Sequence, residues 1–473
     1  MIVKIDNECE KCYKIILLVQ KNNNFYLLVV YTCLALHLHH KWPGKTSTRA
    51  VSHVPTQGSA IMYVIINLIL RSFNPMFKQK NLNLFLLSVP LMNSIARAIY
   101  DVAFIWLVLE LTNSERITGL VAMTSYLPAI LCGLFIGAIV DLFSKTRMIS
   151  FATIMQGLIL TLIPILFFFD IKSVWVIVLI AFFHNAFGLP MVPAFNAYLP
   201  TQIEKDGLLK ANSIVNISWQ TAVLIGPIIA AQLLTVYDVE NLFLFCLVFY
   251  FIAAFITSLA PKDKVEKEEI NFKKIFNKTK EGILYLKKHT TFAFIILLTL
   301  LSNLFVMGPA IVGIPILVKL YLGGTASDFA LVEAFVGLGM LIGTATVYKI
   351  GHKFNHGTLF LLGLFIDGVS FCFYYFIETM TQLNFWSCVH GIGIPFLIIS
   401  RVSIMQKNIP EKLLGRIFAI ISVSILSMTA VSSGIIGFLA EFMSIHEIFL
   451  LFGILAGLCG IAGVLHPKVR YLN

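Results

Sequence analysis

The sequence predicts an all-α polytopic membrane protein, with twelve transmembrane helices arranged in two six-helix halves. Hydrophobic residues make up 58% of the 473 residues and charged residues only 12%, about half the share usual in a soluble domain. A bilayer core about 30 Å thick requires roughly 20 apolar residues per helical span, and such runs recur along the chain. Strands of a membrane barrel would instead give short alternating segments, which this sequence lacks.

The apolar runs fall into two sets of six. The first set lies near residues 83–110, 117–140, 148–169, 173–200, 211–236 and 241–260, and the second near 291–320, 327–348, 357–377, 382–406, 415–440 and 445–466. We therefore expect a first half at 76–260 and a second half at 291–473. The offset that aligns "GLP" at Gly188 with "GIP" at Gly393 nearly equals the one that aligns Gly137 with Gly343. This agreement indicates duplication of a six-helix unit.

A lysine-rich segment joins the two halves. Residues 261–290 hold nine lysines and cannot span a membrane, so they predict a linker that is partly an amphipathic helix. Lys and Arg gather in the loops expected on the same side as this linker, which makes that side cytoplasmic and puts both ends of the bundle there. The same loops explain the net charge of +11, and we expect no nucleic-acid partner.

The first 75 residues fit the bundle poorly. Their two apolar runs, 25–38 and 60–70, are short for a membrane span. We therefore expect residues 1–75 to be an appendage outside the bundle that contributes nothing to its function, with the functional chain beginning at Met76.

A short loop between the second and third spans carries a recognisable pattern. "GAIVDLFSKTR" runs from Gly137 to Arg147, with Asp141 at a helix end and Lys145 and Arg147 behind it. It resembles the signature G-x-x-x-D-(R/K)-x-G-(R/K)-(R/K) of the major facilitator superfamily. The resemblance implies the major facilitator fold, with Asp141 in a contact that latches the cytoplasmic side shut. The alternative is a boundary acid followed by positive-inside cations.

Two further segments resemble exporters of that superfamily. "IGPIIAAQ" in the fifth span is similar to the G-P-x-x-G-G element of drug–proton antiporters, with alanines replacing the second glycine pair; the matching residues are Gly226, Pro227, Ala230 and Ala231. The alternative is generic packing of small residues. "MQKNIPEKLLGRIFAI" resembles the loop before the eleventh span of the macrolide-efflux and enterobactin-exporter branch, through Gln406, Pro410, Gly415 and Arg416.

Ionisable residues inside apolar runs are candidates for proton coupling. Arg97 and Asp101 lie four residues apart in the first span and so share a helix face. They form either an internal salt bridge or a proton site in which Asp101 carries the proton and Arg97 tunes it. Glu333 and Asp367 are further candidates, each of which either carries protons or pairs with a cation.

The family resemblance implies that the first, fourth, seventh and tenth spans line a central cavity. The candidate substrate contacts in those spans are Tyr100, Phe104, His184, Asn185, Asn303, Trp386 and His390. Aromatic walls suit an amphipathic organic molecule. For the two histidines the alternative is hydrogen-bonded packing inside the bundle.

These observations predict a secondary transporter of a bacterial inner membrane. It would export a small amphipathic solute, drug-like or siderophore-like, in exchange for protons by alternating access, as a monomer. The sequence has neither a phosphate-binding glycine loop nor a nucleophile–base set, so we expect no ATP hydrolysis, no enzyme activity and no cofactor. The lone Cys9-Cys12 pair and the histidines from His37 to His40 lack companion ligands, so we expect no metal site. The alternatives are an importer of a siderophore or other solute on the same fold, and a non-transporting receptor or lipid-handling protein.

Overall fold

The computed structural model describes residues 13–21, 24–32, 80–263 and 272–472, and its contacts divide the chain into two units, Met1–Asn74 and Pro75–Asn473. In the first unit the described residues form an antiparallel hairpin of β1 (Tyr13–Lys21) and β2 (Asn24–Thr32), with Tyr13 opposite Thr32. The start of the apolar run 25–38 therefore lies in β2. The run 60–70, Cys9, Cys12 and the histidines from His37 to His40 lie outside the described residues.

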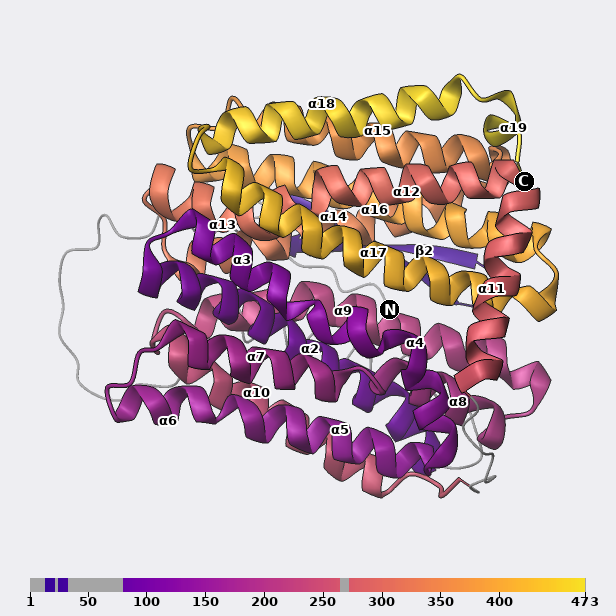
Figure 1. Ribbon diagram of the computed structural model, residues 1–473, viewed down its shortest axis with the longest axis horizontal. Coiled ribbons are helices and arrows are strands. Elements are labelled where there is room, and N and C mark those ends of the chain that lie inside the picture. Colours follow the sequence, from indigo (N-terminus) through magenta and orange to yellow (C-terminus); the bar gives the residue numbers. More distant parts are fainter. Residues whose placement is uncertain (1–12, 22–23, 33–79, 264–271, 473) are drawn as a thin grey trace, which may run out of the picture. The chain divides into compact units, whose positions relative to one another are not determined.

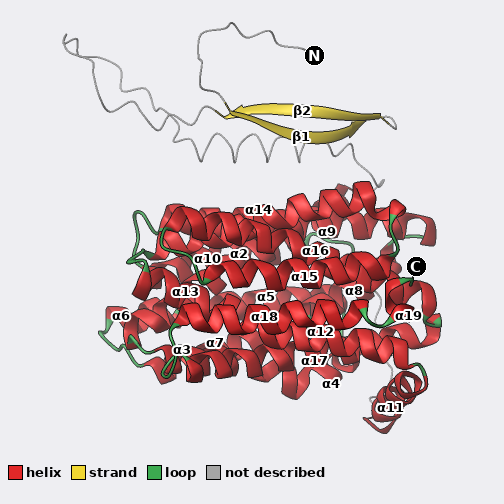
Figure 2. Cartoon of the chain, turned by 90° about the horizontal axis from the view of Figure 1, so that it is seen from above, coloured by secondary structure: helices red, strands yellow, loops and turns green. Residues whose placement is uncertain are grey.

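The second unit is helical wherever the structure describes regular secondary structure in it (Figure 2). Its described residues contain eleven helical spans long and apolar enough to cross a membrane. One more long helix, α2 (Lys80–Thr112), has 33 residues and occupies the position of the predicted first span; its polar and charged residues lower its hydropathy. The predicted all-α fold with two sets of spans is confirmed.

Prolines divide several spans of the first half. After α2 the second span consists of α3 (Glu115–Ser125) and α4 (Leu127–Leu142), the third of α5 (Lys145–Leu160) and α6 (Leu162–Phe168), and the fourth of α7 (Val174–Gly188) and α8 (Met191–Gln202). Each break lies close to Pro128, Pro164 or Pro190, because proline lacks a backbone N–H and its ring obstructs the preceding turn. The helix α9 (Lys205–Leu233), the short η1 (Val239–Asn241) and α10 (Leu242–Ser258) complete this half.

The second half begins with the linker helix α11 (Phe272–Lys288). Its first membrane span joins α12 (Thr290–Gly308), the π-helical η2 (Pro309–Gly313), α13 (Ile314–Ile316) and the π-helical η3 (Leu317–Tyr321). Wide π turns accommodate Pro309 and Pro315, which cannot donate backbone hydrogen bonds. The remaining elements are α14 (Ala326–Ile350), η4 (Gly351–Lys353), α15 (His356–Tyr374), α16 (Met380–Asn408), α17 (Glu411–Leu439), α18 (Ile445–Val464) and α19 (Pro467–Arg470).

The helices of the second unit run side by side, so their ends form two faces (Figure 1). We call the face that carries α11 and the ends of α8 and α16 the linker face; it lies to the right in Figure 1. The face with the ends of α2, η3 and α17 is the opposite face. First-half helices fill the lower part of that view and second-half helices the upper part, so the halves meet along one long seam.

Glycines bring α14 and α16 into backbone contact. A methyl group on Gly339 would collide with the carbonyl oxygen of Cys388, and one on Gly391 would collide with that of Val336. Such close approach is typical of helix packing in membranes, where small residues replace a hydrophobic driving force. This contact between α14 and α16 fixes the residues that follow Gly391 beside the middle of α14.

The start of the linker is fastened to the loop before α5. The carboxylate of Asp263 accepts hydrogen bonds from the Ser144 hydroxyl at 2.8 Å, the Lys145 N–H at 2.6 Å and the Thr146 hydroxyl at 2.9 Å. Burial acts to raise the pKa of Asp263, but these bonds from Lys145, Ser144 and Thr146 outweigh it, so its pKa lies below the ordinary value. Asp263 therefore caps α5 from outside the helix.

We expect Asp263→Ala to lower the free energy of unfolding by about 1 kcal/mol, as for loss of a helix cap. The effect should appear as a lower thermal unfolding midpoint in detergent. Because the folded-state pKa is depressed, the stabilisation is present above the unfolded pKa of about 3.9 and is lost as pH falls through the lower folded value. The difference between wild type and variant should therefore persist at pH values above about 4 and fade below it.

The matched control is Asp238→Ala, because the Asp238 side chain makes no capping hydrogen bond to η1. Equal midpoints for wild type and Asp263→Ala at neutral pH would contradict the capping role.

Candidate functional site

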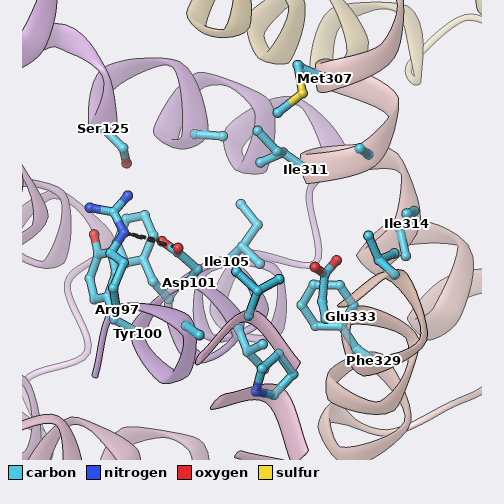
Figure 3. Close-up of a pocket in the computed structure, with 18 of the residues that line it drawn as sticks. Arg97, Tyr100, Asp101, Ile105, Ser125, Met307, Ile311, Ile314, Phe329 and Glu333 are labelled. Atoms are coloured by element: carbon cyan, nitrogen blue, oxygen red, sulfur yellow. Dashed lines mark hydrogen bonds and ion pairs between the residues drawn. The ribbon is translucent and has the colours of Figure 1, made fainter. Parts of the chain in front are cut away.

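A cavity of about 370 Å³ lies on the seam between the two halves (Figure 3). The helices α2, α3 and α9 of the first half line it, together with η2, α14 and α16 of the second. Most of its surface is apolar, including Ile105, Met307, Ile311, Ile314 and Phe329. A cavity of this size, with a few polar groups on apolar walls, is typical of a small-molecule site.

The first-half wall carries a compensated ion pair. Arg97 Nε donates to the two carboxylate oxygens of Asp101 at 2.9 Å and 3.0 Å, and Arg97 Nη1 donates to Asn185 Oδ1 at 2.7 Å. Asn185 Nδ2 in turn donates to the Tyr100 hydroxyl at 3.2 Å. The spacing of four residues puts Arg97 and Asp101 one helical turn apart, so the pair forms within α2 itself. The structure therefore contains the internal salt bridge between Arg97 and Asp101.

The second-half wall carries Glu333 of α14. Figure 3 shows its carboxylate across the cavity from the Arg97–Asp101 pair, beside Ile314 and Phe329. Within the described part of the chain, no cation lies within ion-pairing distance of Glu333. The cavity therefore presents one carboxylate whose charge no neighbouring side chain balances.

Behind this wall the structure brings together two residues that the sequence left separate. His390 of α16 lines the cavity, and its Nδ1 lies 3.4 Å from Oδ1 of Asp367 on α15. Both side chains are buried, with 5% and 6% of their surface exposed. The Phe371 ring stacks on the imidazole with the ring centroids 4.6 Å apart.

The other predicted cavity residues divide into two groups. Tyr100 and Phe104 line the cavity, and His184 lies just behind Tyr100 with the ring centroids 4.2 Å apart. Asn303 and Trp386 lie away from the lining. The Asn303 amide donates to the Thr299 carbonyl of its own helix at 2.9 Å. Trp386 stacks on Phe373 with the ring centroids 4.0 Å apart.

The residues of the exporter-like element in α9 lie at the cavity and the seam. Gly226 packs so closely against Ala98 of α2 that a methyl group there would collide with it, and Pro227 lines the cavity. Ala230 and Ala231 are buried.

The two loop motifs lie at the linker face. Gly137 and Asp141 fall in the last turns of α4, and their side chains lie outside what the structure describes. Lys145 is the buried first residue of α5, and Arg147 is exposed. In the other motif Gln406, Pro410 and Gly415 are exposed, whereas Arg416 pairs with Glu281 of α11.

Three cross-seam contacts hold the halves together at the opposite face. Lys319 Nζ in η3 donates to the Leu109 carbonyl at 3.0 Å and to Asn113 Oδ1 at 2.9 Å. Arg116 pairs with Glu441 at 3.4 Å, and the Ser327 hydroxyl donates to the Ala231 carbonyl at 3.0 Å. A cation is favoured at the carboxyl end of a helix, so the lysine stabilises the end of α2 from the other half. We call these three contacts the opposite-face seal.

Sequence reasoning missed two buried or half-buried cations. Lys319 lies near the end of the apolar run of the seventh span. A lone lysine within such a run is itself a signal of a functional or paired cation. Arg401 is buried in α16, and its Nε has no hydrogen-bond partner in the described part of the chain. Its position within an apolar run was the same kind of signal.

The sequence profile described as Major Facilitator Superfamily matches residues 86–366, more than half of the chain. The chain belongs to the Major Facilitator Superfamily. Among curated relatives of this superfamily transporter, macrolide efflux protein A of Streptococcus pyogenes is 24% identical over 388 residues, covering 80% of this chain and 94% of the relative. Macrolide efflux protein A of Enterococcus faecalis is 23% identical over 306 residues, covering 63% of this chain and 93% of the relative.

Solved transporter structures share the fold of this superfamily member. The nucleoside transporter NupG superposes with a TM-score of 0.67 at 12% identity, covering 82% of this chain and 99% of NupG. A POT family transporter in complex with 5-aminolevulinic acid gives a TM-score of 0.66, also at 12% identity, covering 81% of this chain and 96% of that transporter. The predicted macrolide-efflux-like branch is confirmed. The protein is an integral membrane transporter and not an enzyme.

We expect Lys319→Met to weaken the opposite-face seal of this superfamily transporter. The charged hydrogen bonds of Lys319 contribute about 1.5 kcal/mol or more, so the ratio of unsealed to sealed molecules should rise about tenfold. Spin labels at Val236 and Phe442, both exposed at the opposite face, should then report longer distances in a cysteine-depleted background.

Lys172→Met is the control, because Lys172 pairs with Asp170 inside a single loop and does not cross the seam. Unchanged distance distributions in Lys319→Met would show that the lysine does not hold the seal.

Proposed function

We propose that this transporter exports an amphipathic organic solute, drug-like or siderophore-like, across a bacterial inner membrane in exchange for protons. The observation that carries the proposal is the seam cavity, with its apolar walls and the uncompensated carboxylate of Glu333. The relatives named as macrolide efflux proteins support the outward direction and a bulky amphipathic solute. Both walls come from one chain, which supports function as a monomer.

The orientation follows from the positive charges. The linker helix α11 is rich in lysine, and Lys145, Arg147, Lys407 and Arg416 lie at the same face. Cations remain preferentially on the cytoplasmic side, so we place the linker face there. The opposite-face seal then closes the outward route, and the described arrangement corresponds to a state before release of the solute. Breaking that seal is the step that would expose the cavity to the outside.

The charges of the cavity define the preferred solute. Arg97 and Asp101 neutralise each other, so an ionised Glu333 leaves the lining with one net negative charge. A negative group on apolar walls attracts a solute with an apolar body and a cationic group. We therefore assign solute binding to Glu333 and the apolar lining, with Tyr100 and Phe104 on the facing wall.

The ion pair in α2 changes the proposed role of Asp101. An aspartate held by two hydrogen bonds from one guanidinium is stabilised in its charged form. Losing that charge would leave Arg97 uncompensated in the bundle, which is unfavourable. We therefore assign Arg97 and Asp101 to holding α2 against Asn185 of α7, and the proton to the second half, where Asp367 and His390 lie.

The proposed function is tested in proteoliposomes with an acidic interior. Protons leaving down their gradient should drive ethidium, a permanent organic cation, and tritiated erythromycin into the vesicles. Accumulation should exceed that of protein-free liposomes and disappear with a protonophore. Uptake only when protons and solute move in the same direction would indicate an importer instead. Uptake under neither gradient would leave a receptor or lipid-handling protein.

We expect Glu333→Gln to weaken ethidium binding at least about tenfold, because the amide keeps the shape but removes the charge opposite the cation. Fluorescence anisotropy of ethidium with purified protein measures the affinity. Glu378→Gln, the same change at an exposed position, is the control. Equal affinities in wild type and Glu333→Gln would remove Glu333 from the solute site.

A further inference from the structure

We propose that His390 and Asp367 together form the proton-binding site of the exchange, separate from the solute carboxylate Glu333. The inference rests on the proposed proton-coupled export and names the group that carries the proton. Two helices build the site, with the imidazole on α16 and the carboxyl group on α15. Nδ1 and Oδ1 lie 3.4 Å apart.

The two facing atoms of the pair have no other hydrogen-bond partner in the described part of the chain. Neither His390 Nδ1 nor Asp367 Oδ1 has a hydrogen-bond partner among the described residues, although the two atoms face each other. With the imidazole neutral and the carboxylate ionised, the pair holds one negative charge in a buried position. Such a charge is costly unless a cation or a proton compensates it. A single added proton makes the pair neutral as a whole, either as an imidazolium beside a carboxylate or as an imidazole beside a carboxylic acid.

The surroundings provide no other compensation for this charge. Asp367 has no ion-pair partner besides His390 in the described part of the chain. The ionisable side chains on the helices packed against the pair, and on its own two helices, are Asp328, Glu333, Tyr348 and Lys349 of α14, Glu411, Lys412 and Arg416 of α17, His446, Glu447 and Cys459 of α18, Lys468 and Arg470 of α19, His356, Cys372 and Tyr374 of α15, and Cys388, Arg401 and Lys407 of α16.

Few of these groups lie near the depth of the pair. Tyr374 shares its hydrogen bond with Ser387 at 2.7 Å, and Arg401 is eleven residues from His390, or about 16 Å along the helix. Glu333 lines the same cavity as His390, opposite the mutually paired Arg97 and Asp101, and Glu333 and His390 interact electrostatically. The proton on the pair and the cation at Glu333 are thus the two positive charges that the second-half wall can hold.

The position of the pair gives it one route to the cavity. His390 lines the cavity and Asp367 does not, so a proton enters and leaves through the imidazole. Gly393 makes room for the carboxylate, because a methyl group there would lie 2.6 Å from Asp367 Oδ1. Phe371 covers one face of the imidazole and holds the ring against Asp367.

This arrangement links the proton to the solute. A cationic group bound at Glu333 raises the electrostatic potential at His390 and disfavours the proton there, and a bound proton disfavours the cation equally. Mutual exclusion of proton and solute is the condition for antiport. Without the proton the pair carries a negative charge that favours the cation, so release of the proton and loading of the solute support each other.

The test compares Asp367→Asn, His390→Gln and Glu333→Gln with wild type in three measurements. These are ethidium accumulation driven by an acidic vesicle interior, ethidium exchange without a gradient, and ethidium affinity between pH 5 and pH 8, the range in which a histidine site titrates. In wild type the affinity for ethidium should decrease as the pH is lowered, by up to about tenfold per pH unit for one competing proton.

Asp367→Asn and His390→Gln should retain exchange, lose gradient-driven accumulation, and bind ethidium with an affinity that changes less than about twofold over this pH range. Glu333→Gln should bind more weakly at every pH, and the slope that remains is the part supplied by His390 and Asp367. A purely structural pair would instead lower affinity and exchange at all pH values and leave the slope intact. Asp170→Asn is the control, because it makes the same chemical change in an exposed loop whose positive φ of 58° asparagine tolerates.

The outcomes separate this inference from the proposed function. If wild type itself accumulates neither ethidium nor erythromycin in acidic vesicles, proton-coupled export is wrong. If wild type accumulates them, and Asp367→Asn and His390→Gln both do so with the wild-type pH slope of affinity, the proton site lies elsewhere. Should Asp367→Asn fail to fold, Gly393→Ala displaces the same carboxylate without changing any ionisable group, and it should flatten the slope in the same way.

Discussion

Charge inside a low-dielectric bundle is costly unless it is compensated, and this cost explains the contacts that several charged residues of the transporter make. Arg97 and Asp101 compensate each other within a single helix. Lys319 is satisfied by the carbonyl end of α2 in the other half of the chain. An uncompensated charge at such depth costs several kcal/mol. Each compensating contact therefore fixes the relative position of the helices that supply it, and changing a contact requires those helices to move.

Close helix packing determines which charged side chains lie near one another in the second half. The backbone contact at Gly339 and Gly391 brings α14 and α16 together and places Glu333 and His390 on one cavity wall. Gly393 admits the Asp367 carboxylate beside α16. An added methyl group at any of these positions would collide with the neighbouring helix. The small residues of the second half are thus part of the electrostatics of the site as well as of its packing.

The sequence predicted what depends on local patterns and missed what depends on pairs of helices. Apolar run length predicted the spans, and the spacing of four residues indicated that Arg97 and Asp101 share a face. Asp367 and His390 are 23 residues apart on antiparallel helices, and no periodicity encodes the rotation that turns their side chains toward each other. The same holds for Lys319, whose partners lie more than 200 residues away, and for Asp263, which caps a helix 118 residues earlier. The loop residue Asp141 stays a prediction.

The two halves handle buried charge in different ways, and that difference assigns their roles. In the first half a permanent cation lies beside the carboxylate, so the Arg97–Asp101 pair is neutral overall while Asp101 is ionised. In the second half the partner of the carboxylate is a histidine, whose charge changes in the physiological range. Duplicated six-helix units would give equivalent frames, and among the described residues the carboxylate–histidine pair lies in the second half. In the proposed exchange, the proton gradient would therefore act on the second-half wall, and the first-half pair would provide a fixed wall against which the solute is held.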